Sequence, residues 1–327
     1  MKFPHLLLSA ALLSATLTTA RAQQRLYVSD ISNNTIERYT LPSGTGTQFT
    51  NNGLDLGYRI AFDAAGSLYA ANFNNNTLEK YTSTAGVLSS TGTLFTSNGL
   101  GNPFGLAFDA TGSLYVSNGS TNEIRKFAFT AGVLSTTGTL FASLSGSPHD
   151  LSFDATGNLY VSIPGDGLFS SDLIAKFTAS AGVLSNTQNT FTNSGLNNPY
   201  GLAFDAAGNL FVANRGGNTI EKYTSTAGVL SSTGTVFTSS GLNLPSALAF
   251  DATGSLYVSN ASTNVERFAS TAGVLSSTGT VFTTNGVTAP EGLAFAPTVV
   301  PEPSSAVLLL AGLGTAAVRR RRMKAAH

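Results

Sequence analysis

Two short phrases alternate six times along the chain, and their spacing limits the fold more than any other feature. The first, Gly-Leu-Ala-Phe in its commonest form, ends at Phe62, Phe108, Phe153, Phe204, Phe250 and Phe295. The second, typified by Leu-Tyr-Val-Ser-Asn, begins at Leu26, Leu68, Leu114, Leu159, Leu210 and Leu256. The successive phenylalanines are 46, 45, 51, 46 and 45 residues apart. A period near 46 with several strand-like runs per repeat indicates a radial β array.

One unit, residues 201–238, shows why the repeat predicts β structure. Large Leu202 and Phe204 alternate with small neighbours, which is the period of a strand. An Asp205-to-Gly208 turn then leads to further strand-like runs at 210–213, 219–223 and 234–238. Four antiparallel strands per repeat predict an all-β, six-bladed β-propeller.

The two ends of the repeat region are incomplete in complementary ways. The first unit starts with the second phrase at Leu26, and the last run, 291–295, is a first phrase with nothing paired after it. We therefore expect the N-terminal strands to pair with the C-terminal innermost strand, which completes the sixth blade and removes exposed edges. An open array or a β-helix is the alternative, although a β-helix has a shorter period.

The units resemble NHL repeats in runs such as 109–118 and 122–127. This resemblance implies a six-bladed propeller. It is weak for function, because relatives of this architecture include protein- and RNA-binding modules, lyases and lactonases.

The first 22 residues have the features of a secretory signal peptide. Lys2 precedes an apolar run at 6–17, and Ala20-Arg21-Ala22 provides a small-residue cleavage site. An N-terminal anchor or a buried helix is the alternative. We expect residues 23–297 to form the propeller and residues 298–327 to form a separate tail.

The tail has three parts in a fixed order. Pro301, Glu302 and Pro303 precede an apolar run at 306–318, and Arg319, Arg320, Arg321 and Arg322 follow it. This order resembles the PEP-CTERM sorting signal of Gram-negative bacteria. The resemblance implies recognition by an exosortase, transient membrane association through the tail, and delivery through the periplasm to the cell surface or extracellular matrix. The tail is then either cleaved or retained as an anchor.

Composition limits the partners and the chemistry. Residues 23–300 contain 16 acidic and 10 basic side chains, with no basic cluster, which argues against nucleic acid as a partner. The chain has no cysteine, so thiolate chemistry and cysteine-based metal sites are excluded.

The residues that enter the innermost strands are expected to meet at one end of the central channel. Candidate ligand-binding residues at this channel mouth are Tyr58, Arg59, Phe104, His149, Asp150, Tyr200 and Glu291. Other blades carry Gly105, Gly201, Ser246, Ala247 and Gly292 at these positions. One interpretation is a polar pocket for a small ligand or glycan. The other is ordinary variation at a solvated loop mouth.

One repeat is about five residues longer than the rest, between Ile163 and Asp172. Asp166 and Asp172 offer carboxylate oxygens, which calcium prefers. Their spacing matches no known calcium loop, so a plain surface insertion is the alternative. We expect no cofactor beyond a divalent cation such as calcium.

These observations favour an exported, non-enzymatic binding scaffold whose partner is a polysaccharide or an envelope protein. The alternative is a lyase or lactonase-like enzyme that uses His149 or Glu291. His149 is the only histidine in residues 23–300, which excludes a three-histidine metal site there. Recurrent Asn or Asp after the second strand, as at Asn72, is expected to cap turns. Glu79-Lys80 and Glu221-Lys222 are expected on solvated strand faces.

Overall fold

The computed structural model describes residues 24–165 and 171–297, which lie in one compact unit, Gln23–Val299. The predicted signal peptide, the sorting tail and Asp166 lie outside the described residues. Throughout the described ranges the regular structure is β, and they hold no helix long and apolar enough to cross a membrane.

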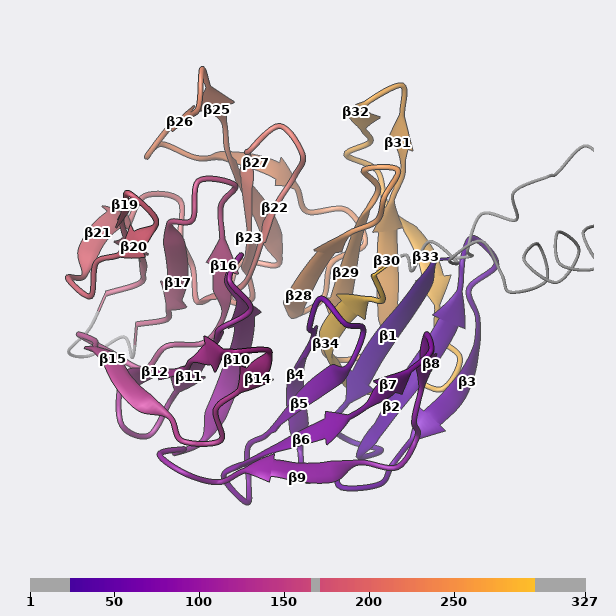
Figure 1. Ribbon diagram of the computed structural model, residues 1–327. Coiled ribbons are helices and arrows are strands. Elements are labelled where there is room, and N and C mark those ends of the chain that lie inside the picture. Colours follow the sequence, from indigo (N-terminus) through magenta and orange to yellow (C-terminus); the bar gives the residue numbers. More distant parts are fainter. Residues whose placement is uncertain (1–23, 166–170, 298–327) are drawn as a thin grey trace, which may run out of the picture. The chain divides into compact units, whose positions relative to one another are not determined.

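Six four-stranded antiparallel sheets form the blades of a β-propeller (Figure 1). Blade 1 contains β1 (Arg25–Asp30), β2 (Thr35–Thr40), β3 (Thr45–Thr50) and β34 (Pro290–Phe295), and blade 2 contains β4 (Gly57–Phe62), β5 (Leu68–Asn72), β6 (Thr77–Tyr81) and β9 (Thr93–Thr96). Blade 3 contains β10 (Pro103–Phe108), β11 (Leu114–Asn118), β12 (Glu123–Phe127) and β15 (Thr139–Ser143), and blade 4 contains β16 (Leu151–Phe153), β17 (Leu159–Ile163), β18 (Leu173–Phe177) and β21 (Asn189–Thr192). Blade 5 contains β22 (Pro199–Phe204), β23 (Leu210–Asn214), β24 (Thr219–Tyr223) and β27 (Thr235–Thr238), and blade 6 contains β28 (Pro245–Phe250), β29 (Leu256–Asn260), β30 (Asn264–Phe268) and β33 (Thr280–Thr283). The predicted fold class is confirmed.

The ring closes as the incomplete end repeats predict. β34 pairs antiparallel with β1, with Ala294 opposite Tyr27 and Gly292 opposite Ser29. The six innermost strands contact one another in a closed circuit from β4 through β10, β16, β22, β28 and β34 back to β4. Leu293 of the closing strand packs with Leu26 and Val28 in one core cluster. Closure therefore gives every innermost strand a hydrogen-bonded partner strand within a four-stranded blade.

Aromatic rings fill each interface between neighbouring blades. The second-strand aromatic residue of every blade makes edge-on contacts with an outer-strand Phe of its own blade and with the last Phe of the next innermost strand. The central rings are Tyr27, Tyr69, Tyr115, Tyr160, Phe211 and Tyr257, with centroid separations of 5.0 to 5.4 Å. Edge-on pairs add stabilisation beyond their buried area. This repeated triad explains the regular phenylalanines of the sequence.

Short hairpins project beyond blades 2 to 6, between the third and fourth strands (Figure 1). They are β7 (Ser83–Thr84) with β8 (Val87–Leu88), β13 (Phe129–Thr130) with β14 (Val133–Leu134), β19 (Ala179–Ser180) with β20 (Val183–Leu184), β25 (Ser225–Thr226) with β26 (Val229–Leu230), and β31 (Ser270–Thr271) with β32 (Val274–Leu275). The sequence analysis assigned no strand to the corresponding segment between the runs 219–223 and 234–238. These hairpins lie on the face opposite the channel mouth, because they follow the ends of the third strands that pair with Leu68, Leu114, Leu159, Leu210 and Leu256.

The prediction for the third-strand glutamates was wrong. Glu79 and Glu221 are only 7% and 4% exposed. Glycines make room for them, since a Cβ on Gly53 would lie 2.6 Å from the Glu79 carboxyl carbon. Burial raises the pKa of both carboxyls. The adjacent lysine faces the other way, and the Lys80 ammonium lies 5.1 Å from the Tyr69 ring centroid.

The recurrent Asn after the second strand is structural, as predicted. The Asn72 amide donates to the Gly53 carbonyl at 2.6 Å and accepts from the Asp55 N–H at 3.1 Å. Asn118, Asn214 and Asn260 donate to the equivalent glycine carbonyls at 2.7 to 2.8 Å. These bonds fix the loops that lead into the innermost strands, and so they hold the channel mouth in shape.

Candidate binding site at the channel mouth

Side chains of alternating size line the start of the innermost strands. Position by position around the ring, the residues are Arg59, Gly105, Asp150, Gly201, Ala247 and Gly292. A Cβ on Gly105, Gly201 or Gly292 would lie within 2.2 to 2.4 Å of a carbonyl oxygen of the next blade. The three glycines are therefore obligatory, because the neighbouring backbone occupies that space. Only blades 2, 4 and 6 carry a side chain at this level.

Arg59 of blade 2 reaches across the mouth to residues of blades 6, 1 and 4. Its guanidinium donates to the Ser246 carbonyl at 3.0 Å, to the Ser246 hydroxyl at 3.1 Å and to the Glu291 carbonyl. Its Nε lies 3.6 Å from the Asp150 carboxylate. Arg59 is only 7% exposed, so these bonds compensate the burial of its charge.

Arg59 also supplies an interblade hydrogen bond in place of one that the second strand of blade 5 cannot donate. The fourth residue of the second strand is a serine in four blades, and Ser117 donates to the His149 carbonyl of the next blade at 2.6 Å. Ser162 makes the equivalent bond to Tyr200 at 2.5 Å. Blade 5 carries Ala213 at this position, and the carbonyl of Ser246 receives the Arg59 guanidinium instead.

The two acidic candidates are engaged in the same buried network. The Asp150 carboxylate accepts the N–H groups of Leu151 and Leu202, each at 3.0 Å. Glu291 is 1% exposed and accepts two bonds from Arg215, at 2.8 and 3.1 Å, together with one from the Ser246 hydroxyl. Both carboxylates therefore serve to shape the floor of the mouth.

The aromatic candidates form a continuous arc above this floor. The Phe104 and His149 rings stack with centroids 4.3 Å apart and an interplanar angle of 18°. His149 meets Tyr200 edge-on at 4.2 Å, and Tyr58 meets Phe104 at 4.8 Å. These four side chains are half-buried, in contrast to the charged floor. The structure thus brings all seven predicted residues together, four in a half-buried aromatic arc and three in a buried charged network.

His149 is held neutral within the arc. Burial is the main cause that lowers its pKa to about 3, and the positive charges of Arg59 and Arg215 add to the effect. Its Nδ1 atom is buried and has no hydrogen-bond partner. A side chain with this pKa is a poor general base at neutral pH.

Two residues of the mouth were missed by the sequence analysis. The Phe73 ring lies 4.9 Å from Phe104 and 5.2 Å from Tyr58, which extends the arc outward. The guanidinium carbon of Arg215 lies 4.6 Å from the Tyr200 ring centroid while the same group pairs with Glu291. Each follows the recurrent Asn, where the other blades have Ile31, Gly119, Pro164 and Ala261. This difference in residue type between the blades was the sequence signal that could have identified Phe73 and Arg215.

Of the two candidate calcium ligands, Asp166 lies outside the described residues, and Asp172 is engaged by backbone groups. Both oxygens of Asp172 accept backbone N–H groups, from Gly165 at 2.7 Å and from Asn198 at 3.0 Å. Asn76 and Asn218 make the equivalent bond to the next blade at 2.6 and 2.7 Å, so Asp172 has a structural role. No group of three or more His, Asp or Glu side chains in residues 24–165 and 171–297 is arranged to hold a metal ion. Calcium binding involving Asp166 stays a prediction.

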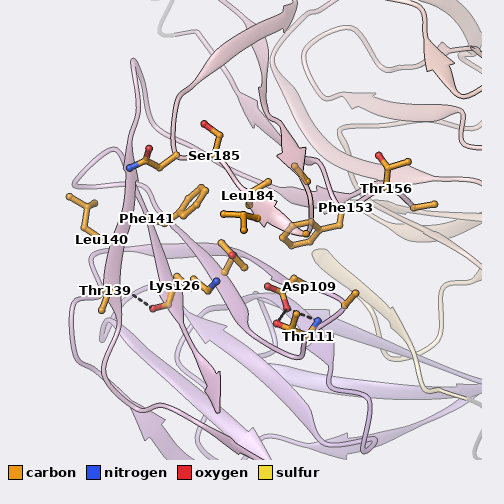
Figure 2. Close-up of a pocket in the computed structure, with 18 residues that line it drawn as sticks. Asp109, Thr111, Lys126, Thr139, Leu140, Phe141, Phe153, Thr156, Leu184 and Ser185 are labelled. Carbon is orange, nitrogen blue, oxygen red and sulfur yellow. Dashed lines mark hydrogen bonds between the residues drawn. The ribbon is translucent and has the colours of Figure 1, made fainter. Parts of the chain in front are cut away.

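A separate groove of about 700 Å³ lies between blades 3 and 4 on the opposite face (Figure 2). Phe141, Phe153, Asp109 and Lys126 are among the residues that line it. Asp109 accepts two bonds from Thr111 within its turn, and the Lys126 ammonium lies 5.1 Å from the Tyr115 ring. The same aromatic triad fills every blade interface. We therefore interpret the groove as a result of the regular packing between blades. The candidate site is placed at the mouth, where the residues differ from blade to blade.

Comparisons with known proteins agree with this architecture. Residues 299–322 match the PEP-CTERM protein-sorting motif. This motif implies an exported protein that an exosortase sorts toward the cell surface. A search among curated proteins finds no match.

Solved propellers share the fold at low sequence identity. A chain of a nidogen–laminin complex is 18% identical with a TM-score of 0.66, covering 84% of this chain and 99% of that chain. A gluconolactonase from Xanthomonas campestris is 17% identical with a TM-score of 0.53, covering 81% and 86%. Virginiamycin B lyase from Staphylococcus aureus is 14% identical with a TM-score of 0.52, covering 79% and 84%. At these identities the likeness concerns the fold alone, and the NHL resemblance stays a prediction.

Proposed function

We propose that this chain is an exosortase-sorted surface propeller whose channel mouth binds a segment of an envelope or matrix protein. The observation that carries the proposal is the half-buried arc of Tyr58, Phe73, Phe104, His149 and Tyr200, bordered by Arg215. Tyrosine, phenylalanine and arginine are the residues enriched at the cores of protein interfaces.

The arc is also organised before any partner arrives. Each ring packs against a neighbour, and the buried network of Arg59, Asp150 and Glu291 supports it from below. A binding surface whose side chains are already ordered loses less conformational entropy on association. The fold has precedent in such a role, because one structural neighbour comes from a nidogen–laminin complex.

The lyase or lactonase alternative has weaker support. A lactonase and a lyase share the fold. However, His149 is a poor base with its pKa lowered to about 3, and the oxygens of Asp150 and Glu291 are bound to backbone groups, Ser246 or arginine. Acid–base catalysis at the mouth would require this network to rearrange.

The test compares two phenylalanine substitutions on opposite faces. The full chain, a Phe73→Ala variant and a Phe129→Ala variant are immobilised and exposed to separate envelope-protein and polysaccharide fractions. We expect the full chain and Phe129→Ala to retain a defined envelope protein, and Phe73→Ala to bind it at least tenfold more weakly. Phe129 is the matched control because it is 42% exposed on the hairpin face.

Two results would count against the proposal. Retention of polysaccharide alone, lost in Phe73→Ala, would replace the protein partner by a glycan. Equal retention of every bound protein by all three chains would remove the mouth as the site.

A further inference from the structure

The face opposite the mouth displays the same apolar side chain five times. Each hairpin of blades 2 to 6 carries Ala-Gly-Val-Leu at its turn. The five valines, here named the hairpin tips, are Val87, Val133, Val183, Val229 and Val274, and they are 71, 68, 71, 72 and 71% exposed. A single exposed valine needs no explanation, but the same one at five equivalent positions suggests a common contact.

The local structure directs these valines away from the protein. Ala85 and Gly86 both have positive φ, of 50° and 76°, as the tight two-residue hairpin turn requires. The valine follows at the start of the returning strand, where it adds little to the packing. The hairpin segments at 83–92, 129–138, 179–188, 225–234 and 270–279 contain no charged residue.

Both ends of the described chain leave from this same face. Pro297 lies beside the turn at Gly66, with its Cγ 3.9 Å from where a Cβ on that glycine would stand. At the other end, the Gln24 side-chain oxygen accepts the N–H of Ala252 in the equivalent turn of blade 6, at 3.1 Å. The Ala296 N–H also donates to the Arg25 carbonyl at 3.0 Å.

The sequence beyond Pro297 limits how far the body can lie from a membrane. Eight residues, 298–305, separate it from the apolar run 306–318 and the arginines 319–322. Fully extended, such a segment spans at most about 30 Å. If the apolar run is held in a bilayer, the face from which the chain leaves stays close to that bilayer.

We propose that the hairpin tips rest on the lipid surface while the tail is held in the membrane, so that the channel mouth faces away from it. The proposal rests on the sorting part of the proposed function and not on what the mouth binds. The occupant we infer is a neutral bilayer surface. Single valines on separate blades, without charges, do not make the contiguous core of a protein interface, but a fluid lipid interface accepts them one by one.

The experiment places single labels on the full chain. The chain has no cysteine, so one introduced cysteine carries one environment-sensitive fluorophore. Val87→Cys and Val229→Cys report on the hairpin tips, and Asn75→Cys, exposed on the mouth face, is the matched control. Each labelled chain is reconstituted with phosphatidylcholine vesicles that contain nitroxide-labelled lipid.

We expect the lipid nitroxide to quench the tip labels at least twofold more than the Asn75→Cys label. Replacing the other four tip valines by serine should reduce quenching of Val87→Cys to the control level, while the chain still floats with the vesicles. Equal quenching at both faces would overturn the proposal, as would quenching that requires anionic lipid. Shielding of the tip labels without vesicles would assign the face to a second copy, and failure to float would remove the anchoring premise. None of these results depends on a ligand at the mouth.

Discussion

Acidification should unfold this protein partly through a single side chain, His149. Its pKa is about 3 in the folded protein and 6.5 in a solvated chain. Above pH 6.5 both states hold a neutral imidazole, and the group does not affect stability. As the pH falls below 6.5, His149 becomes protonated in the unfolded chain but stays neutral in the folded protein. The free energy of unfolding therefore falls until the pH approaches 3. Each pH unit below 6.5 lowers the free energy of unfolding by about 1.4 kcal/mol, so the loss at pH 5, about 1.5 units lower, is about 2 kcal/mol.

The matched variant is His149→Phe. The same position holds Tyr58, Phe104 and Tyr200 in three other blades, so a phenyl ring preserves the stack without a titrating group. Urea unfolding is followed by tyrosine fluorescence at pH 7.5, 6 and 5, because the chain has ten tyrosines and no tryptophan. The difference in unfolding free energy between the two proteins should shift by about 2 kcal/mol between pH 7.5 and pH 5, in favour of the variant. Other titrating groups cancel in this difference. A difference that is constant with pH, or an imidazole NMR signal of His149 that titrates near pH 6.5, would refute the reasoning.

Three further changes test other parts of the structure. Arg59→Met should lower the free energy of unfolding by about 3 kcal/mol, because it leaves the buried Ser246 carbonyl without a donor and removes the positive charge beside Asp150. Lys80→Met, at an outer cation, should cost under about 1 kcal/mol in the same urea titration. Leu293→Ala in the closing strand should lower the free energy of unfolding by about 2–5 kcal/mol and speed hydrogen exchange in β1. Val87→Ala at an exposed tip should change it by less than about 0.5 kcal/mol. Slow exchange in β1 after Leu293→Ala would contradict ring closure. Glu79→Gln should stabilise the protein at pH 8, and this gain should disappear below pH 4.5. Burial raises the pKa of the Glu79 carboxyl, so its ionised form destabilises the folded protein. A gain independent of pH would contradict this.

The fold was readable from the sequence because each repeat contains its own strand pattern and its own turn. The phenylalanines that set the period occupy the blade interfaces, and the incomplete ends matched the pairing of β1 with β34. The five hairpins escaped prediction because two-residue strands give no alternation to detect. The buried glutamates escaped it because the space for Glu79 comes from Gly53, which lies far away in the sequence.

The mouth was only partly readable for a similar reason. Strand starts revealed Tyr58, Phe104, His149 and Tyr200, because equivalent positions in a repeat can be aligned by counting. Counting cannot show that Arg59 reaches Ser246 of blade 6, since the length of its side chain and the missing hydroxyl at Ala213 decide that together. Phe73 and Arg215 could also be found by counting, but their significance depends on their contacts with the aromatic rings of other blades or of the same blade, which the sequence does not show.

The alternation of glycine with larger residues at the start of the innermost strands has a consequence for how this ring can change in evolution. The glycines of blades 1, 3 and 5 leave room that the backbone carbonyl groups of blades 2, 4 and 6 occupy. Loss or duplication of one repeat would set two blades of the same parity side by side, either crowding the axis or leaving a hole in it. We therefore expect this mouth to tolerate the gain or loss of two adjacent repeats better than that of a single repeat.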